Sequence, residues 1–390
     1  MTTADPAPTR GGVFLPQTRA LLLDGYRRIN ASALFWITLL LSLVVVSLIA
    51  LPTIDDRGVS LFGFVLFPML TPNLVPPDVF YKSLFTSIGL TAPLIAWLTI
   101  WANVLAIVST AGIFPNLLSG GSIDLYLSKP LGRLRLFLTV YVIGLLFAAL
   151  QVTVFCVGGF LIIGIRGGSW EPAVFLAVPL VVLIFSYVWS ISTLIGVWSR
   201  STLMAILVTV LLWGLFGLVQ FAETFIILPQ AVQTELAVER NDATIERFET
   251  IVAKQSKPDD ENAKPSPFQL QLDSARERSA GLQSTADAWG LAHDITFAIY
   301  MVLPKTADTA RLTERWLIDA AELGPMGEED EDPGLENEAD VDVDFSDPEI
   351  GERMEAAITS RSPVMIIGTS LLIEFAVLGV AAWIFARRDY

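Results

Sequence analysis

The chain has 390 residues, of which 53% are hydrophobic and only 17% are charged, with a mean hydropathy of +0.59. Ordinary soluble domains carry about 25% charged residues, so this composition excludes a typical soluble globular protein. The net charge of −15 is concentrated in residues 229–362, which hold 30 acidic and 12 basic residues. No basic patch with interleaved aromatic residues occurs, and we therefore expect no nucleic acid as a partner.

Cysteine and histidine are too scarce for metal chemistry. The chain has one cysteine, Cys156, and one histidine, His293, whereas zinc sites usually need several such ligands. Cys156 lies inside an apolar block and is expected to be a packing residue, and His293 is expected in a loop or at the membrane interface. We expect no metal site and no catalytic residue in this chain.

The first 32 residues predict a cytoplasmic N-terminus followed by an amphipathic elbow helix. Within 16–32, Leu21, Leu22 and Ile29 stand against Arg19, Arg27 and Arg28. This pattern is typical of a helix that lies on the inner leaflet of a membrane, with its apolar face in the lipid.

Six apolar blocks, five of them within 33–228, predict transmembrane helices, because each is close to or above the roughly 20 residues that cross a bilayer. Inside lipid the backbone must satisfy its own hydrogen bonds, which favours helices. The predicted fold class is therefore an all-α, polytopic membrane protein. The third block is long enough to tilt or to extend beyond the bilayer, and its glycines permit close helix approach. The blocks lie at 33–51, 84–110, 134–165, 173–198, 203–228 and 363–386.

Residues 229–362 form a long acidic insertion between the fifth and sixth predicted helices. Glu, Lys, Gln and Ala alternate over 231–290, which predicts exposed helices broken between Pro258 and Pro267. The apolar stretch 291–304 is too short to span a bilayer, so a helix that dips into the membrane interface is expected. The stretch 324–350 has many acidic and no basic residues, which predicts disorder.

The distribution of Lys and Arg predicts the orientation, because short cytoplasmic loops collect these residues. With the N-terminus inside, both termini are cytoplasmic, residues 363–390 form the last helix and an inner tail, and the insertion 229–362 lies outside. Ten basic residues then lie inside and three outside. The inner ones are Arg10, Arg19, Arg27, Arg28, Lys129, Arg133, Arg135, Arg200, Arg387 and Arg388, and the outer ones are Arg57, Lys82 and Arg166.

The chain has no motif that would bind ATP phosphates, since no GxxxxGK[ST] run occurs. An ATP-driven process would need a separate ATPase. The inner loop 112–138 is the best candidate for contact with such a partner, because it has helix breakers at Pro115 and Pro130 and basic residues near its end. The same cations also fit a solvated loop that only follows the positive-inside bias.

Three segments resemble the ABC-2 type transporter permeases. In SIDLYLSKPLGRLRLFL, Leu127, Ser128, Pro130 and Arg133 match the Leu-Leu-Ser-x-Pro-x-x-Arg core of that family, and Asp124 lies near its acidic position. The final FARRDY is similar to the closing signature of the family, and LLLDGYRRINASALFWITLLLS is similar to its elbow and first span. The family's Glu-x-x-x-Gly-Thr stretch is replaced by SGGSID, and most of 235–350 has no counterpart. The similarity is closest to the branch associated with multicopper-enzyme maturation.

The resemblance implies a permease subunit, most similar to exporters, in a bacterial cytoplasmic membrane. It implies a homo- or heterodimer of permease subunits bound to two ABC ATPase subunits, with ATP and Mg²⁺ on the ATPases and no cofactor on this chain. Two sets of residues would contact the ATPase. The elbow set is Asp24, Tyr26, Arg27 and Arg28, and the loop set is Asp124, Leu127, Ser128, Lys129, Pro130 and Arg133.

Two carboxylates lie in the predicted spans, where a charge costs about 2.5–3.5 kcal/mol on insertion scales. Glu374 lies near the middle of the last span. It is expected either to line a substrate path or dimer interface, or to be protonated or hydrogen-bonded to a neighbouring helix. Glu223 lies near the outer end of the fifth span. It is expected either to be a functional carboxylate within the membrane or simply to reach water.

Other functions stay open at this point. A membrane anchor that presents 229–362 as an assembly or sensing module fits the same pattern of spans. Secondary transport is less favoured because buried charges are few and no inverted repeat is visible. An intramembrane enzyme would need a catalytic set that the spans do not contain.

Overall fold

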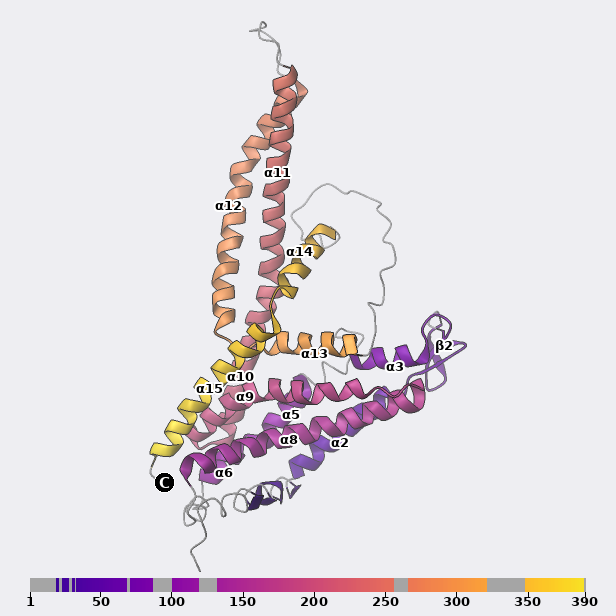
Figure 1. Ribbon diagram of the computed structural model, residues 1–390, viewed down its shortest axis with the longest axis vertical. Helices are drawn as coiled ribbons and strands as arrows, with labels where there is room; N and C mark the ends of the chain where they lie inside the picture. The colour runs from indigo at the N-terminus through magenta and orange to yellow at the C-terminus, as the bar shows by residue number, and fades with distance from the viewer. Residues whose placement is uncertain are drawn as a thin grey trace, which may run out of the picture. The chain divides into compact units, whose positions relative to one another are not determined.

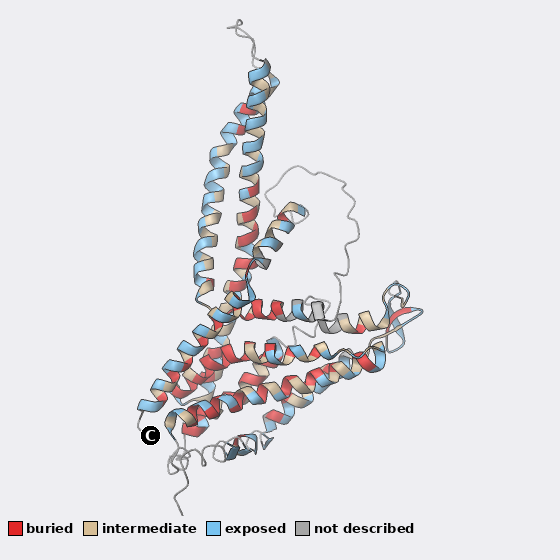
Figure 2. Cartoon of the chain, in the orientation of Figure 1, coloured by how far each residue is buried: buried red, intermediate tan, exposed pale blue. Residues whose placement is uncertain are grey.

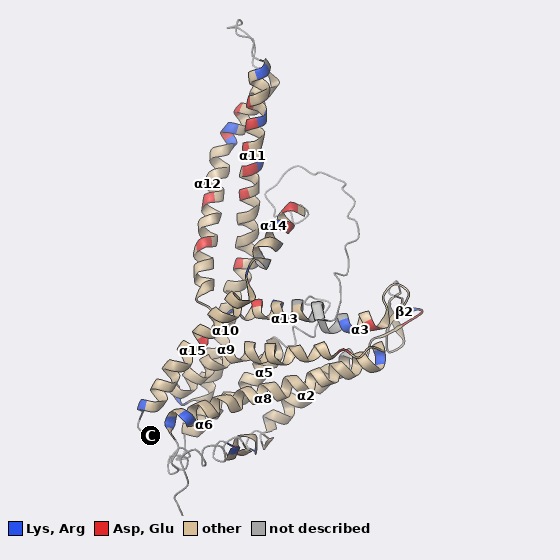
Figure 3. Ribbon diagram, in the orientation of Figure 1, with Lys and Arg blue, Asp and Glu red and all other residues tan. Residues whose placement is uncertain are grey.

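Four helical segments of the computed structural model are long and apolar enough to cross a membrane. The structure describes residues 19–20, 23–27, 30–31, 33–68, 71–86, 100–118, 132–255, 266–320 and 348–388. Within these ranges the four segments are Arg133–Gly167, Pro172–Ser199, Thr202–Lys254 and Pro363–Arg387. They contain the last four predicted spans, and four such segments indicate a multi-pass membrane protein. Figure 3 shows that the basic residues of the segments Arg133–Gly167 and Pro363–Arg387 lie at the segment ends.

The first two predicted spans are shorter in the described part of the chain. Helix α2, Ala33–Ile49, has 17 residues. The second predicted span contains the end of α3, Pro77–Thr86, and all of α5, Ala102–Thr110, while residues 87–99 lie outside the described ranges. A short helix α6, Ile113–Leu118, follows.

A small antiparallel sheet between α2 and α3 contradicts the all-α prediction locally. Its strands are β1 (Thr53–Asp55), β2 (Gly58–Leu61) and β3 (Phe64–Phe67), paired in that order. The β2–β3 turn has two residues, Phe62 and Gly63, both with positive φ (52° and 86°). Two-residue turns with this backbone match the twist of paired strands, so the sequence Phe-Gly closes the hairpin.

The chain divides into two compact units. The first contains residues up to Gly214, Thr306–Glu331 and Ser370–Tyr390, and the second contains Leu215–Lys305 and Asp332–Thr369. The long helices of the first unit carry buried residues along their length, whereas much of the second unit is exposed (Figure 2).

In the first unit, helices α8 and α9 form the centre. Helix α8, Arg133–Ile162, continues as a π-helical turn, Ile163–Gly167, and α9, Ala177–Ser199, follows a 3₁₀ turn at Pro172–Leu176. Helix α8 packs on both α9 and α2, and α13, Thr306–Ala320, packs on α9. Figure 1 shows α8 and α9 running alongside each other.

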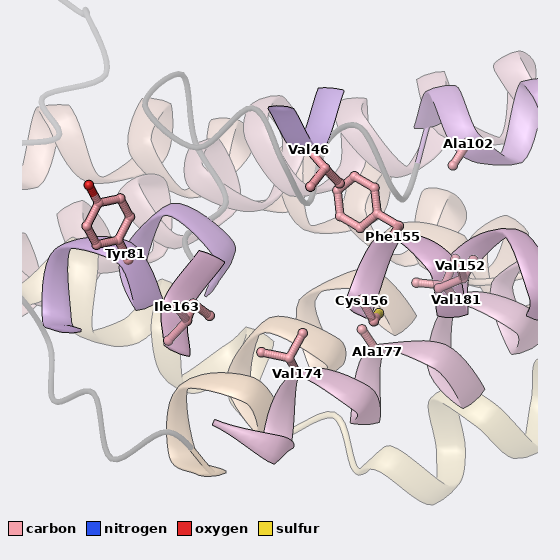
Figure 4. Packing of buried hydrophobic residues seen from close by; sticks show 10 residues of the cluster. All are labelled: Val46, Tyr81, Ala102, Val152, Phe155, Cys156, Ile163, Val174, Ala177 and Val181. Atoms are coloured by element: carbon pink, nitrogen blue, oxygen red, sulfur yellow. The ribbon is translucent and has the colours of Figure 1, made fainter. Parts of the chain in front are cut away.

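Small residues allow these helices to approach closely. A Cβ atom on Gly144 would lie 2.6 Å from the Trp189 indole on α9, and one on Gly158 would lie 2.6 Å from Val46 on α2. Close approach of this kind replaces hydrophobic attraction as the source of packing inside lipid. Cys156 lies in the core beside Val152, as predicted for a packing residue (Figure 4).

The second unit contains a pair of long helices, α11 (Leu228–Gln255) and α12 (Pro267–Met301), that pack against each other. This confirms the exposed helices predicted for 231–290. Helix α10 (Thr202–Ala222) runs into α11 through a π-helical turn at Glu223–Ile227. Helix α14 (Pro348–Thr359) packs on α11.

The apolar stretch 291–304 is helical up to Met301, as the sequence predicts. Most of it forms the last turns of α12, which runs uninterrupted to Met301, because no Gly-Pro or Pro-rich break precedes Leu291. The final span, α15, covers Pro363–Arg387. Most of the acidic stretch 324–350, which is predicted to be disordered, lies outside the described ranges, since these omit 321–347.

The contact between Gly144 and Trp189 gives a test of the α8–α9 packing. Gly144→Ala should destabilise the protein by about 1–3 kcal/mol, because the added methyl group overlaps the indole. Gly214→Ala is the matched control, since a Cβ atom there meets nothing within 4 Å and alanine favours a helix by about 1 kcal/mol. Denaturation of the purified variants in one detergent measures both, and equal stabilities of the two variants would contradict this packing.

Candidate functional site

An arginine cluster joins three helix ends in the first unit. Arg133, the first residue of α8, donates from Nη1 to the carbonyl oxygens of Ala386 (3.1 Å) and Arg388 (2.8 Å). These carbonyls belong to the end of α15, where helical carbonyls lack partners within the helix. The last residue of the predicted coupling motif therefore binds the closing segment of the chain.

Arg388 extends this cluster to α9. Its Nη1 donates to the carbonyl oxygens of Val197 (2.9 Å) and Trp198 (3.0 Å). A cation is favourable at a helix C-terminus because the exposed carbonyls carry partial negative charge. The start of α8 and the ends of α9 and α15 are thus connected by charge-assisted hydrogen bonds.

Aromatic packing supports the same helix ends from within. The rings of Phe114 on α6, Phe137 on α8 and Phe385 on α15 are buried, and the centroid of Phe137 lies 5.2 Å from Phe114 and 5.6 Å from Phe385. Pro115, predicted to break a helix, is instead the third residue of α6, because proline is tolerated in the first helical turn.

Most of the predicted coupling loop lies outside the described residues. Asp124, Leu127, Ser128, Lys129 and Pro130 fall within 119–131, which the structure leaves out. Arg133 is the member of this set that the structure places.

Within the elbow, residues 23–27 are helical. Gly25 is buried against Ile143 of α8. Asp24 is half-buried, whereas Tyr26 and Arg27 are exposed. Arg28 lies outside the described ranges. One face of the elbow therefore packs on the bundle and another is open.

Glu374 is buried in the first unit, with 6% of its surface exposed. Its Oε1 accepts from the Tyr141 hydroxyl on α8 and its Oε2 lies at the same distance, 2.8 Å, from Oγ of Ser186 on α9. Glu374 is therefore hydrogen-bonded to neighbouring helices, which is one of the two alternatives expected from the sequence. Trp189 completes this layer by stacking near Tyr141 and donating from Nε1 to the Tyr141 carbonyl at 3.2 Å.

Glu223 does not reach water, in contrast to one of the two alternatives from the sequence. It is fully buried in the second unit, and Arg361 donates to its Oε1 at 2.6 Å. His293 is part of α12 rather than of a loop, and its Nδ1 lies 3.9 Å from the same Oε1. A basic residue before the last span thus neutralises this carboxylate.

The sequence reasoning missed a cation pair around Tyr300. Arg361 lies 4.8 Å and the Lys305 ammonium 4.9 Å from the Tyr300 ring centroid, a geometry of cation–π attraction. Lys305 is fully buried and donates to Oγ1 of Thr369 at 2.8 Å. Burial, and then the nearby Arg361 charge, lowers the pKa of Lys305 to about 8. The sequence does carry a signal for this pair, since Lys305 and Arg361 are basic residues within the acidic stretch 229–362.

The described residues contain no group of three or more His, Cys, Asp and Glu that could hold a metal ion. The first unit instead offers a rigid polar end, made by Arg133 and Arg388, and a buried carboxyl group, Glu374. The first suits mechanical contact with a partner, and the second suits binding of a proton or a cation.

Comparison of the chain with protein-family models, with curated proteins and with solved structures gives no match.

The arginine cluster predicts that substitution of Arg388 destabilises the protein more than substitution of the adjacent Arg387. Arg388→Ala should destabilise the protein by about 1.5–3 kcal/mol, the range for hydrogen bonds to charged groups, because it uncovers the end of α9. Arg387→Ala is the control, since Arg387 lies over the exposed Trp383 ring at 4.7 Å. Denaturant titration of the detergent-solubilised variants measures the difference. A loss in Arg387→Ala that equals or exceeds the loss in Arg388→Ala would refute the capping role.

The lowered pKa of Lys305 predicts a pH dependence of stability. An unfolded lysine has a pKa of about 10.4, so between about pH 10 and about pH 8 the unfolded chain takes up a proton that the folded chain does not. Stability should fall with decreasing pH across this window, by up to about 1.4 kcal/mol per pH unit, and the contribution should level off below it.

Lys305→Met should remove this slope, because methionine does not titrate. Lys254→Met, at an exposed position near the end of α11, should retain it. Denaturation midpoints at about pH 8 and about pH 10 measure the effect, and an unchanged slope in Lys305→Met would show that another group causes it.

Proposed function

We propose that this chain is the membrane-spanning permease subunit of an ATP-driven transporter of the ABC-2 type, an exporter whose ATPase is a separate polypeptide. The observation that carries the proposal is the bond between Arg133 and the carbonyls of Ala386 and Arg388. Two of the segments that resemble ABC-2 permeases are far apart in the sequence, and this bond joins them into one structural element.

Such an element meets the mechanical requirement of a permease. Force from a partner must pass into rigid bodies that rotate or slide against each other. A push on the loop before Arg133 would reach α8 directly, and it would reach α9 and α15 through the bonds of Arg133 and Arg388. The neighbouring elbow, with Tyr26 and Arg27 exposed, supplies a second contact surface for the ATPase.

In this proposal the chain lies in a bacterial cytoplasmic membrane with both termini in the cytoplasm and 229–362 outside. Two permease subunits pair, and each contacts one ATPase subunit, which binds ATP and Mg²⁺. This chain performs no hydrolysis of its own, and its outer surface contacts membrane lipid.

A second candidate function is a membrane anchor that displays the α11–α12 pair to a partner. The length and exposure of these helices, 28 and 35 residues, favour it. Purification of the full chain from its own membranes in mild detergent separates the two functions. A permease should bring down, in equal amount, a subunit with a GxxxxGK[ST] motif that hydrolyses ATP, whereas an anchor should come down without one.

Substitution of Arg133 tests the proposed coupling. In the purified complex reconstituted into liposomes, coupling is the difference in ATP hydrolysis between the ATPase alone and the ATPase bound to the lipid-embedded permease. Arg133→Ala should abolish this difference, while the rate of hydrolysis itself stays within about twofold of wild type. The reason is that α8 loses its bonds to α15. The matched control is Arg166→Ala, at the opposite end of the same helical segment, and it should behave as wild type. Full coupling in Arg133→Ala would remove the arginine cluster from the mechanism.

A further inference from the structure

Glu374 has no cationic partner among the described residues. Its contacts there are the hydroxyl groups of Tyr141 and Ser186, each at 2.8 Å, and no lysine, arginine or histidine of the described ranges forms an ion pair with it. Glu223, the other buried carboxylate, has Arg361 at 2.6 Å. An ionised carboxylate at membrane depth without a cation is costly, and such groups are found in proton relays.

The hydrogen bonds around Glu374 fit two protonation states without moving any heavy atom. When Glu374 is ionised, Tyr141 and Ser186 both donate to it. When it is protonated at Oε2, its O–H can donate a hydrogen bond to the Ser186 Oγ, because the serine hydroxyl can then donate to the Leu183 carbonyl at 2.8 Å. The Tyr141 hydroxyl keeps its bond to Oε1 in both states, with the Ser186 carbonyl 3.2 Å away as a second acceptor.

Further hydroxyl groups lie beside this carboxyl group. Ser370 precedes Glu374 by one turn of α15 and is fully buried, as is Thr309 on α13. The hydroxyl of Tyr187 on α9 lies near both of them and near Glu374. This hydroxyl is buried and interacts with the hydroxyl groups of Thr309 and Ser370, so three hydroxyl groups from α9, α13 and α15 gather beside Glu374.

We propose that Glu374 is a proton-binding site, which takes up one proton at Oε2 to form a carboxylic acid and releases it again to regenerate the carboxylate. Tyr141 and Ser186 hold the carboxyl group in both states. Tyr187, Ser370 and Thr309 form the polar side from which the proton arrives. The inference concerns this chain alone and does not depend on a partner ATPase.

The other titratable groups around the site come from each helix that packs there. Helix α8 contributes Tyr141 and α9 contributes Tyr187. Helix α13, which packs on α9, carries Asp308 and Arg311, whose closest atoms are 3.5 Å apart. Asp308 thus has a cation beside it, whereas the contacts of Glu374 in the described residues are hydroxyl groups.

Infrared difference spectroscopy of the full-length protein in lipid nanodiscs tests this directly. The C=O stretch of a carboxylic acid is absent from a carboxylate, and exposed Asp and Glu stay ionised between about pH 6 and about pH 9. The wild type should gain a carboxylic acid band as the pH is lowered across this range. The band should disappear in Glu374→Gln and remain in Glu223→Gln, the control for a buried carboxylate that is paired with Arg361.

A second variant keeps the test valid if Glu374→Gln does not fold. Ser186→Ala removes the oxygen that accepts a hydrogen bond from protonated Glu374, and it should shift the frequency of the same band without abolishing it. No band in the wild type, a band that is constant across the whole pH range, or a titrating band that persists in Glu374→Gln would each overturn the proposal. A band unchanged in frequency in Ser186→Ala would also overturn the role of Ser186.

Discussion

The low polarity of a bilayer is the constraint on which this structure depends, because a polar group inside it must find its partner within the protein. The apolar helices meet this requirement for their backbones. Their few polar side chains meet it by bonding to neighbouring helices, as Tyr141 and Ser186 do with Glu374. Hydrogen bonds of this kind fix the relative positions of α8, α9 and α15, while small residues such as Gly144 bring α8 and α9 into contact.

The same constraint separates two roles for buried carboxylates. Glu223 is paired with Arg361 beside a layer of aromatic rings, and this pairing links the π-helical turn at Glu223–Ile227 to the segment before α15. Glu374 has only hydroxyl partners in the described residues, and its charge can therefore change. At the ends of the helices, carbonyl oxygens lack partners within the helix. Arg133 and Arg388 donate hydrogen bonds to these oxygens and so connect three helices.

Composition and periodicity predicted the last four spans, the exposed helices of 231–290 and the packing role of Cys156. These features follow from local apolar content, which a sequence displays directly. The pairing of Glu223 with Arg361 and of Arg133 with Arg388 could not be predicted, because the partners are separated by more than 130 residues and one sequence does not show which distant groups meet. The sheet at Thr53–Phe67 was missed because its turn uses Phe62 with positive φ, an uncommon choice for a non-glycine residue. The elbow contact through Gly25 likewise depends on a neighbour, Ile143, that lies far along the chain.

The central proposal is that a partner on the inner side of the membrane drives this chain through the loop before Arg133, and that residues 229–362 lie on the outer side. Labelling of introduced cysteines tests it most directly, because the one native cysteine, Cys156, is buried. Ser128→Cys marks the loop, and Ser284→Cys marks an exposed position on α12. A membrane-impermeant maleimide applied to intact spheroplasts should label Ser284→Cys at once and Ser128→Cys only after lysis. Labelling of both positions from the same side would contradict the account.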